Sequence, residues 1–125
     1  MILADTSVWV GHLRAASPHL QLALEEGRML AHPLVIGELA CGNLRQRTVI
    51  LEALQALPSA TPATHEEVLR LVEDRRLWGR GLGWIDAHLL ASARLTGCRL
   101  WTLHRRLRRA ARDLGVAYST VSGTR

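Results

Sequence analysis

Three acidic residues of this sequence stand in apolar surroundings, where carboxylates could do chemistry. Asp5 directly follows the apolar run of residues 2–4, Glu38 has apolar neighbours at helical spacing, and Asp86 has leucines one turn further along. A carboxylate buried alone is costly or takes up a proton, and three facing one core would repel one another. A divalent cation between them would relieve both problems, and all-oxygen ligation suits Mg²⁺ or Mn²⁺. Such a site could support metal-assisted phosphodiester hydrolysis.

Each of the three acids also has an ordinary structural explanation, which spacing alone leaves open. Asp5 could cap the next helix, Glu38 could pair with an arginine at a helix edge, and Asp86 could interact with a helix dipole. The other acids have polar neighbours and are interpreted as solvated helix faces or caps; they are Glu25, Glu26, Glu52, Glu66, Glu67, Glu73, Asp74 and Asp113.

The elements that must position these acids are predicted from apolar runs and helix-end signals. Strands are predicted at residues 1–4, 29–31, 99–103 and 116–118. Helices are predicted at residues 8–14, 18–26, 33–47 with a soft break at 42–43, 48–57, 65–78, 84–96 and 105–114, with Thr6 or Ser7 capping the first. This alternation favours an α/β fold, a single domain over residues 1–125 with a mainly parallel sheet between helices. Functional groups collect at the carboxyl ends of such strands, where Asp5 would lie.

The charge of the chain favours a nucleic acid as partner. The net charge is +5, and all sixteen basic residues are arginine. Arginine binds phosphate in a bidentate way and stacks on bases, although genomic base composition would equally explain the missing lysine. No apolar stretch approaches the roughly 20 residues of a membrane span, and the start lacks the basic region of a signal peptide. We therefore expect a cytoplasmic protein without a membrane partner, in which Cys41 and Cys98 are buried thiols rather than a disulfide.

Four segments of the chain, in order, resemble the PIN-domain ribonucleases, specifically the VapC toxins of bacterial toxin–antitoxin pairs. They are residues 2–9 (ILADTSVW), 32–40 (HPLVIGELA), 79–93 (GRGLGWIDAHLLASA) and 100–107 (LWTLHRRL), and together they span nearly the whole chain. The resemblance implies a PIN-like fold, a central parallel sheet flanked by helices. It also implies an endoribonuclease that depends on Mg²⁺ or Mn²⁺, an RNA substrate, a homodimer, and a cognate antitoxin whose tail enters the active-site groove.

The same resemblance implies roles for particular residues. The three acids discussed above, Asp5, Glu38 and Asp86, fall on the catalytic and metal-binding positions, and Thr6 and Thr102 fall where hydroxyls line the acidic pocket.

The sequence departs from this pattern at His104, where relatives usually offer a fourth acid. Three acids could still hold one Mg²⁺, His104 could ligate a softer metal such as Mn²⁺, or His104 could contact the phosphate with activity largely lost. The alternative function is therefore a catalytically impaired PIN-fold protein that binds RNA or the antitoxin. A DNA-binding regulator is disfavoured, because acids interrupt the apolar segments and no helix-turn-helix pattern stands out.

Arginines near the end of the chain are candidates for RNA binding. A helix beginning at residue 105 would bury leucines and alanines and present arginines on the opposite face, either to the RNA backbone, to solvent or to the antitoxin. The candidates are Arg105, Arg108 and Arg109, with Arg80 in a second patch. The glycine-rich segment 79–83 lacks the context of a phosphate-binding loop. The four tryptophans are predicted core anchors, with base stacking as the alternative for Trp84.

Overall fold

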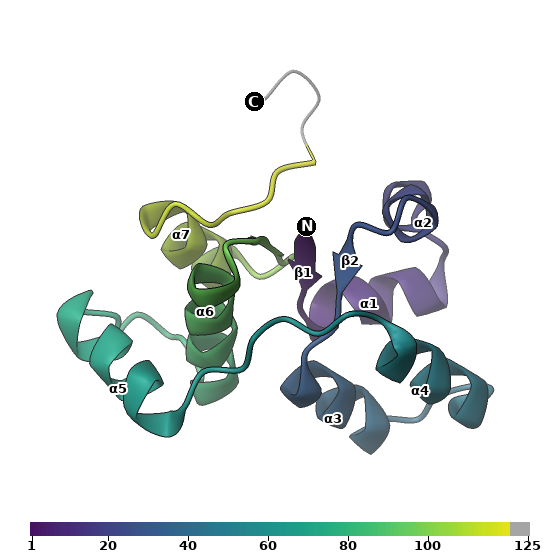
Figure 1. Ribbon diagram of the computed structural model, residues 1–125, viewed down its shortest axis with the longest axis horizontal. Coiled ribbons are helices and arrows are strands. Elements are labelled where there is room, and N and C mark those ends of the chain that lie inside the picture. The colour runs from purple at the N-terminus through teal and green to yellow at the C-terminus, as the bar shows by residue number, and fades with distance from the viewer. Residues whose placement is uncertain (121–125) are drawn as a thin grey trace.

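Three short parallel strands form a sheet at the centre of the molecule, with the order β2-β1-β3. The computed structural model describes residues 1–120 (Figure 1). The strands are β1 (Ile2–Ala4), β2 (Met29–Leu30) and β3 (Arg99–Trp101). Ile2 pairs with Met29 on one side and with Arg99 on the other, so all three strands end at the same edge of the sheet.

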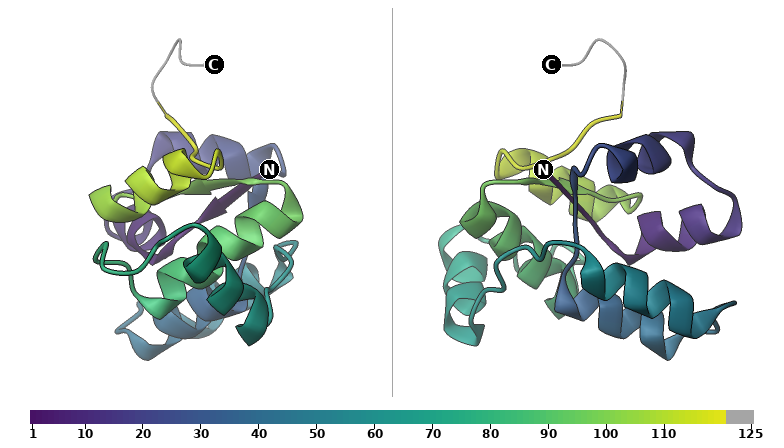
Figure 2. Two further views of the ribbon diagram at one scale, coloured as in Figure 1. Left: turned by 90° about the vertical axis from the view of Figure 1, so that its left-hand side faces the viewer. Right: turned by 45° about the vertical axis from the view of Figure 1, so that its right-hand side comes forward.

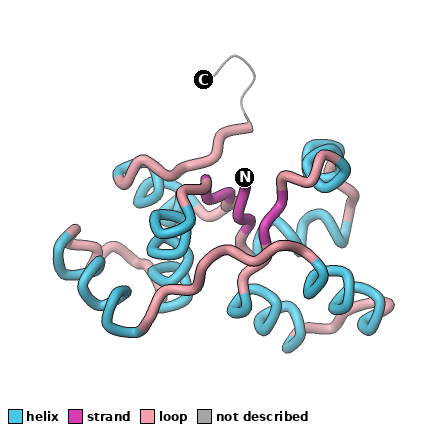
Figure 3. The backbone as a smooth tube through the Cα atoms, viewed as in Figure 1, coloured by secondary structure: helices cyan, strands magenta, loops and turns pink. Residues whose placement is uncertain are grey.

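Seven helices within residues 1–120 surround this sheet, and the predicted α/β class is confirmed (Figure 3). They are α1 (Thr6–Arg14), α2 (Pro18–Glu25), α3 (Pro33–Cys41), α4 (Arg47–Ala56), α5 (His65–Asp74), α6 (Trp84–Thr96) and α7 (Arg105–Asp113). Helices α5, α6 and α7 gather on one side of the strands, and α1 to α4 gather on the other (Figures 1 and 2).

Helix ends follow local chemistry, and most starts were predictable. The Ser17 hydroxyl accepts the backbone N–H of Leu20 at the start of α2, with Pro18 at the first helical position. Thr64 and Glu67 form a reciprocal capping box at the start of α5, with bonds of 3.1 and 2.7 Å. Gly97 ends α6 in the left-handed conformation that favours glycine.

Two predicted helices are longer than the observed ones. The prediction of a soft break at residues 42–43 is wrong, because α3 ends at Cys41 and residues 42–46 separate it from α4. Helix α5 ends at Asp74 rather than at residue 78. Arg76 takes a left-handed φ of 53°, and the N–H of Leu77 returns to the carbonyl of Val72, which is a Schellman ending without glycine. Leu77 is buried by this reversal.

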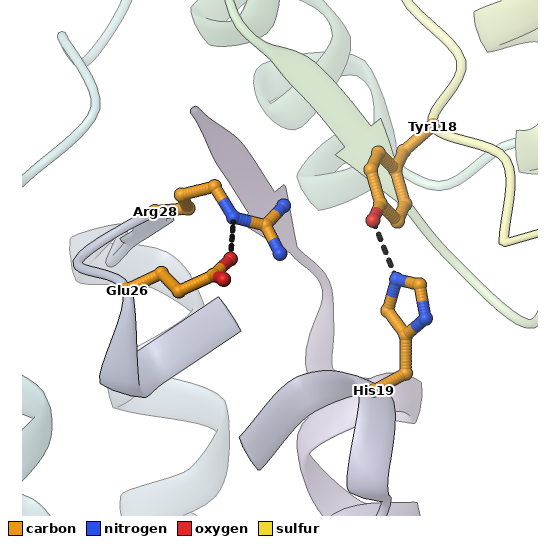
Figure 4. A network of polar contacts seen from close by, with 4 residues as sticks. All are labelled: His19, Glu26, Arg28 and Tyr118. Atoms are coloured by element: carbon orange, nitrogen blue, oxygen red, sulfur yellow. Dashed lines mark hydrogen bonds and ion pairs between the residues drawn. The ribbon is translucent and has the colours of Figure 1, made fainter. Parts of the chain in front are cut away.

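The last predicted strand is absent as a strand, because residues 116–118 make only one bridge, Ala117 with Leu100. A similar bridge joins Ala31 and Ser59 beside β2. Backbone bonds of Leu100 with Val116 and Tyr118 form the bridge at Ala117, and side chains add to it. His19 and the Tyr118 hydroxyl are 2.5 Å apart, next to the Glu26–Arg28 ion pair (Figure 4). The sequence also predicts a frayed tail at residues 122–125, which lies outside the described residues.

The core contains the strands and the inner faces of the helices, with Leu3, Leu90 and Leu100 almost fully buried. Two of the four tryptophan predictions are wrong, because Trp78 and Trp84 are exposed whereas Trp9 and Trp101 are buried. The thiol prediction holds for Cys98 and fails for Cys41, which is exposed. Over residues 1–120, every helix is too short or too polar to cross a bilayer.

Candidate active site

Asp5 lies at the carboxyl end of β1 and is almost completely buried, with 3% of its surface exposed. One carboxylate oxygen, Oδ1, accepts the N–H of Val8 at 3.2 Å and the hydroxyl of Ser7 at 2.5 Å. The other, Oδ2, accepts the hydroxyl of Thr102. Asp5 is also the N-cap of α1, so the predicted caps Thr6 and Ser7 are wrong and the alternative role of Asp5 is real. The buried charge is compensated by hydrogen bonds to both oxygens.

The residues around Asp5 connect the ends of two strands. Thr102 directly follows β3, and its buried hydroxyl donates to Asp5 while accepting the N–H of His104 at 3.0 Å. Ser7 accepts the N–H of Leu103 at 3.1 Å while it donates to Asp5. This bonding fixes the carboxylate of Asp5 in one position, with the Thr102 hydroxyl directly against it.

Glu38 is exposed on α3, so its predicted burial in an apolar stripe is wrong. Its Oε1 accepts the hydroxyl of Thr6 at 2.5 Å, and Thr6 is the residue after Asp5. The two residues line a cavity of about 810 Å³ between α1, α3 and residues 42–46. Thr6 therefore holds the Glu38 side chain toward the end of β1.

Asp86 is half-buried in the first turn of α6, where its Oδ2 accepts the N–H of Gly83 at 2.9 Å. This is one half of a capping box, because Gly83 has no side chain to return the bond. Asp86 also lines a second cavity, of about 560 Å³, together with His104 and Arg105. Since the backbone N–H of His104 bonds to Thr102, this cavity is connected to the Asp5 hydrogen bonds.

The three acids suit a hard cation in type but are not yet arranged around one. Carboxylate and hydroxyl oxygens are the donors that Mg²⁺ and Mn²⁺ prefer. Within residues 1–120, however, no group of three or more His, Cys, Asp or Glu side chains stands ready to hold a metal ion. Glu38 and Asp86 are each occupied by one hydrogen bond near solvent, so both could turn toward a cation at small cost, whereas Asp5 is already fixed.

The chain matches a known protein family. The model of the PIN domain matches residues 2–113. The chain belongs to the PIN-domain family. It is 54% identical over 118 residues to a protein named Ribonuclease VapC32 from two strains of Mycobacterium tuberculosis, and the match covers 94% of this chain and 95% of that protein. The chain is thus a VapC-type PIN domain, as its sequence motifs indicated.

One polar pair in this PIN domain was not found by sequence reasoning. His32, almost fully buried after β2, accepts the N–H of Leu34 at its Nδ1 and lies 2.9 Å from the Ser92 hydroxyl at its Nε2. Burial, together with the nearby charge of His88, lowers the pKa of His32 to about 4. The neutral ring therefore joins the start of α3, which carries Glu38, to α6, which carries Asp86. A serine inside the apolar segment 89–93 was the available signal, because a buried hydroxyl needs a partner.

The candidate RNA-binding arginines of the PIN domain have different surroundings. Arg80 forms an ion pair with Asp113 at 2.7 Å, so it is already engaged in structure. Helix α7 buries Leu107, Ala110 and Ala111 as predicted. Its arginines 105, 108 and 109 are exposed. Arg106, which sequence reasoning omitted, lies against Gly81. The sequence signals available for this contact were the glycine-rich segment 79–83 and the arginine-rich helix, but not their proximity.

Proposed function

We propose that this PIN domain, taken as one unit over residues 1–125, is the endoribonuclease toxin of a VapBC-type pair. The observation that carries the proposal is the fully bonded, buried Asp5 at the carboxyl end of β1. A second carboxylate, that of Glu38, is tied to the neighbouring Thr6. The name of the M. tuberculosis relative, a ribonuclease, supports RNA as the substrate.

The chemistry requires a divalent cation, for which we propose Mg²⁺ or Mn²⁺ held by Asp5, Glu38 and Asp86. When bound, such a cation supplies Lewis-acid chemistry: it lowers the pKa of water and stabilises charge on the phosphate and the leaving oxygen. Thr102 and Ser7 hold the Asp5 carboxylate so that it needs no reorganisation during the reaction. Thr6 orients Glu38, and the exposed arginines 105, 108 and 109 of α7 attract the RNA backbone.

A specific observation favours a second candidate, a catalytically impaired PIN-fold protein that binds RNA or the antitoxin. His104 stands where relatives usually have a fourth acid, and the remaining acids are not poised around a metal. Under either candidate we propose a VapB-type antitoxin as partner, a homodimer and a cytoplasmic location. Light scattering of the purified protein, alone and with its antitoxin, measures the two assemblies.

The deciding experiment is RNA cleavage by the purified protein with added Mg²⁺ or Mn²⁺. We expect cleavage that EDTA and Asp5→Asn each abolish, because both remove the cation from the site. Glu52→Gln is the matched control, since Glu52 is an exposed acid on α4 that lines neither the Glu38 cavity nor the Asp86 cavity, and it should cleave like the wild type. Activity that survives EDTA or Asp5→Asn would reject the metal-nuclease proposal, and an inactive wild type would favour the impaired binder.

A further inference from the structure

The cavity beside Asp86 has an unusual set of charges for a site built around acids. It has a volume of about 560 Å³ and is lined by Gly81, Asp86, His104, Arg105, Arg106 and Leu107. One acidic residue thus shares the cavity lining with two arginines and a histidine. Helix α7 lies beside α6 here, as Figure 2 shows, so the cavity is bounded by two helices and the 79–83 loop.

The opposite charges around this cavity do not neutralise one another. The ion pairs formed within residues 1–120 are Glu26–Arg28 and Arg80–Asp113. Arg105 and Arg106 therefore lack a carboxylate partner in the described part of the chain, although Asp86 lines the same space. Asp86 instead accepts the N–H of Gly83, and both arginines are exposed. The separation leaves room for a polar ligand, and the two unpaired guanidinium groups favour an anion.

The Arg106 side chain lines the cavity and lies against Gly81 of the glycine-rich loop. Gly81 has a φ of +77°, and a Cβ atom at this position would lie 2.7 Å from Cδ of Arg106. The positive φ favours glycine at this position, and the absence of a side chain leaves the space that Arg106 occupies. The Arg80–Asp113 ion pair ties the same loop to the far end of α7. The loop and the helix thus lie against each other, with the Arg106 side chain next to Gly81.

His104 makes the charge of this cavity more positive than the acid of most relatives would. Relatives usually have an acid at this position, which would add a second negative charge to the cavity that Asp86 lines. The imidazole removes that charge and offers a hydrogen-bond donor, while the backbone of His104 stays tied to Thr102. With arginine at the next two positions, the lining becomes net positive.

We infer that this cavity is a phosphate subsite of the active site, where His104, Arg105 and Arg106 contact a phosphodiester of bound single-stranded RNA. His104 is then a phosphate contact and not a metal ligand. The inference rests on the proposed function only in taking RNA as the ligand. Among the alternatives left open for His104 it selects the phosphate contact, combined with three acids that hold the cation, so that activity is kept rather than lost.

The test measures RNA binding without cleavage. A fluorescently labelled short single-stranded RNA is titrated with protein in EDTA, and its anisotropy gives Kd at several salt concentrations. The double variant Arg105→Gln/Arg106→Gln should bind roughly tenfold more weakly, and its salt slope should fall by about 0.7 for each lost contact. Arg112→Gln, the same charge change on the same helix outside the cavity, should change Kd by less than about twofold. If the double variant does not fold, Arg105→Gln alone carries the test, because Arg105 does not pack on Gly81.

A second measurement separates the phosphate contact from metal ligation. His104→Asp should weaken RNA binding in EDTA, because it places a negative charge in the subsite. Mn²⁺ binding to the RNA-free protein, measured by calorimetry, should be the same for wild type and His104→Ala. Weaker Mn²⁺ binding by His104→Ala would make His104 a ligand and overturn the inference.

The two proposals fail in different ways. Wild type that cleaves RNA, with arginine variants that bind it as wild type does, would overturn the subsite and leave the nuclease standing. The arginines would then be free for an acidic protein partner. An inactive wild type whose RNA affinity falls in the double variant, but not in Arg112→Gln, would support the subsite and reject the nuclease.

Discussion

Asp5 and Asp86 are two carboxylates of one proposed site that are held in opposite ways. Asp5 is buried, and both of its oxygens accept bonds from residues at the ends of β1 and β3. Asp86 is half-buried and accepts one bond, from Gly83. A buried charge must be fully hydrogen-bonded, whereas a partly exposed one is solvated and can move. Asp5 is thus part of the architecture, and Asp86 is free to respond to a ligand.

Truncating each carboxylate should separate these roles. We expect Asp5→Ala and Asp86→Ala both to lower RNA cleavage at least about a hundredfold, because each removes a proposed cation ligand. Asp5→Ala should also lower the free energy of unfolding by roughly 2–4 kcal/mol, because α1 loses its N-cap and the donors of Ser7, Val8 and Thr102 lose their acceptor. Asp86→Ala should cost less than about 1 kcal/mol. Urea unfolding measures both, and equal losses of stability would break the contrast.

The pH dependence of stability tests the second buried polar group, His32, which links α3 to α6 as Asp5 links the ends of β1 and β3. The folded pKa of His32 is lowered to about 4. Between about pH 6.5 and pH 4, the unfolded chain therefore binds a proton at His32 and the folded chain does not. Stability is therefore complete above about pH 6.5 and falls by roughly 2–3 kcal/mol as the pH drops to 4. Unfolding of wild type and His32→Asn across this range isolates the effect from the other histidines. Identical slopes for the two proteins would contradict it.

Two threonines provide the finest comparison, because Thr102 serves buried Asp5 and Thr6 serves exposed Glu38. Thr102→Val keeps the shape but leaves an Asp5 oxygen and the His104 N–H unpaired, so we expect a loss of about 1–2 kcal/mol in unfolding free energy. Thr6→Val should change it by less than about 0.5 kcal/mol. Thermal unfolding of both variants checks this, and a larger loss from Thr6→Val would reverse the interpretation.

Local signals made part of this structure predictable. The apolar run before Asp5, the Ser17-Pro18 start and the Gly97 end each depend on neighbouring residues, and the strands and helices they predict are observed. The motifs that run through nearly the whole chain gave the family. The candidate site was harder, because its geometry depends on distant contacts. Spacing could name three acids but could not show that Glu38 is exposed or that Thr102 bonds to Asp5.

The failures have physical causes in tertiary structure. Residues 116–118 have a strand-like pattern, but they make only one bridge, and the Tyr118 ring contacts His19 and Trp101. Leu77 ends α5 early because its burial favours a reversed chain over another helical turn. Arg106 escaped notice because its environment is a loop 25 positions away in the sequence. None of these contacts has a periodic signature.

The two single-residue bridges, Ala31 with Ser59 and Leu100 with Ala117, lie along the two outer strands of the sheet. Each places another segment of the chain's own backbone where a foreign strand would have to attach. Open sheet edges invite strand addition and edge-to-edge aggregation, and short covered edges discourage both. Within residues 1–120, the two outer strands of the sheet therefore offer a foreign strand little open backbone.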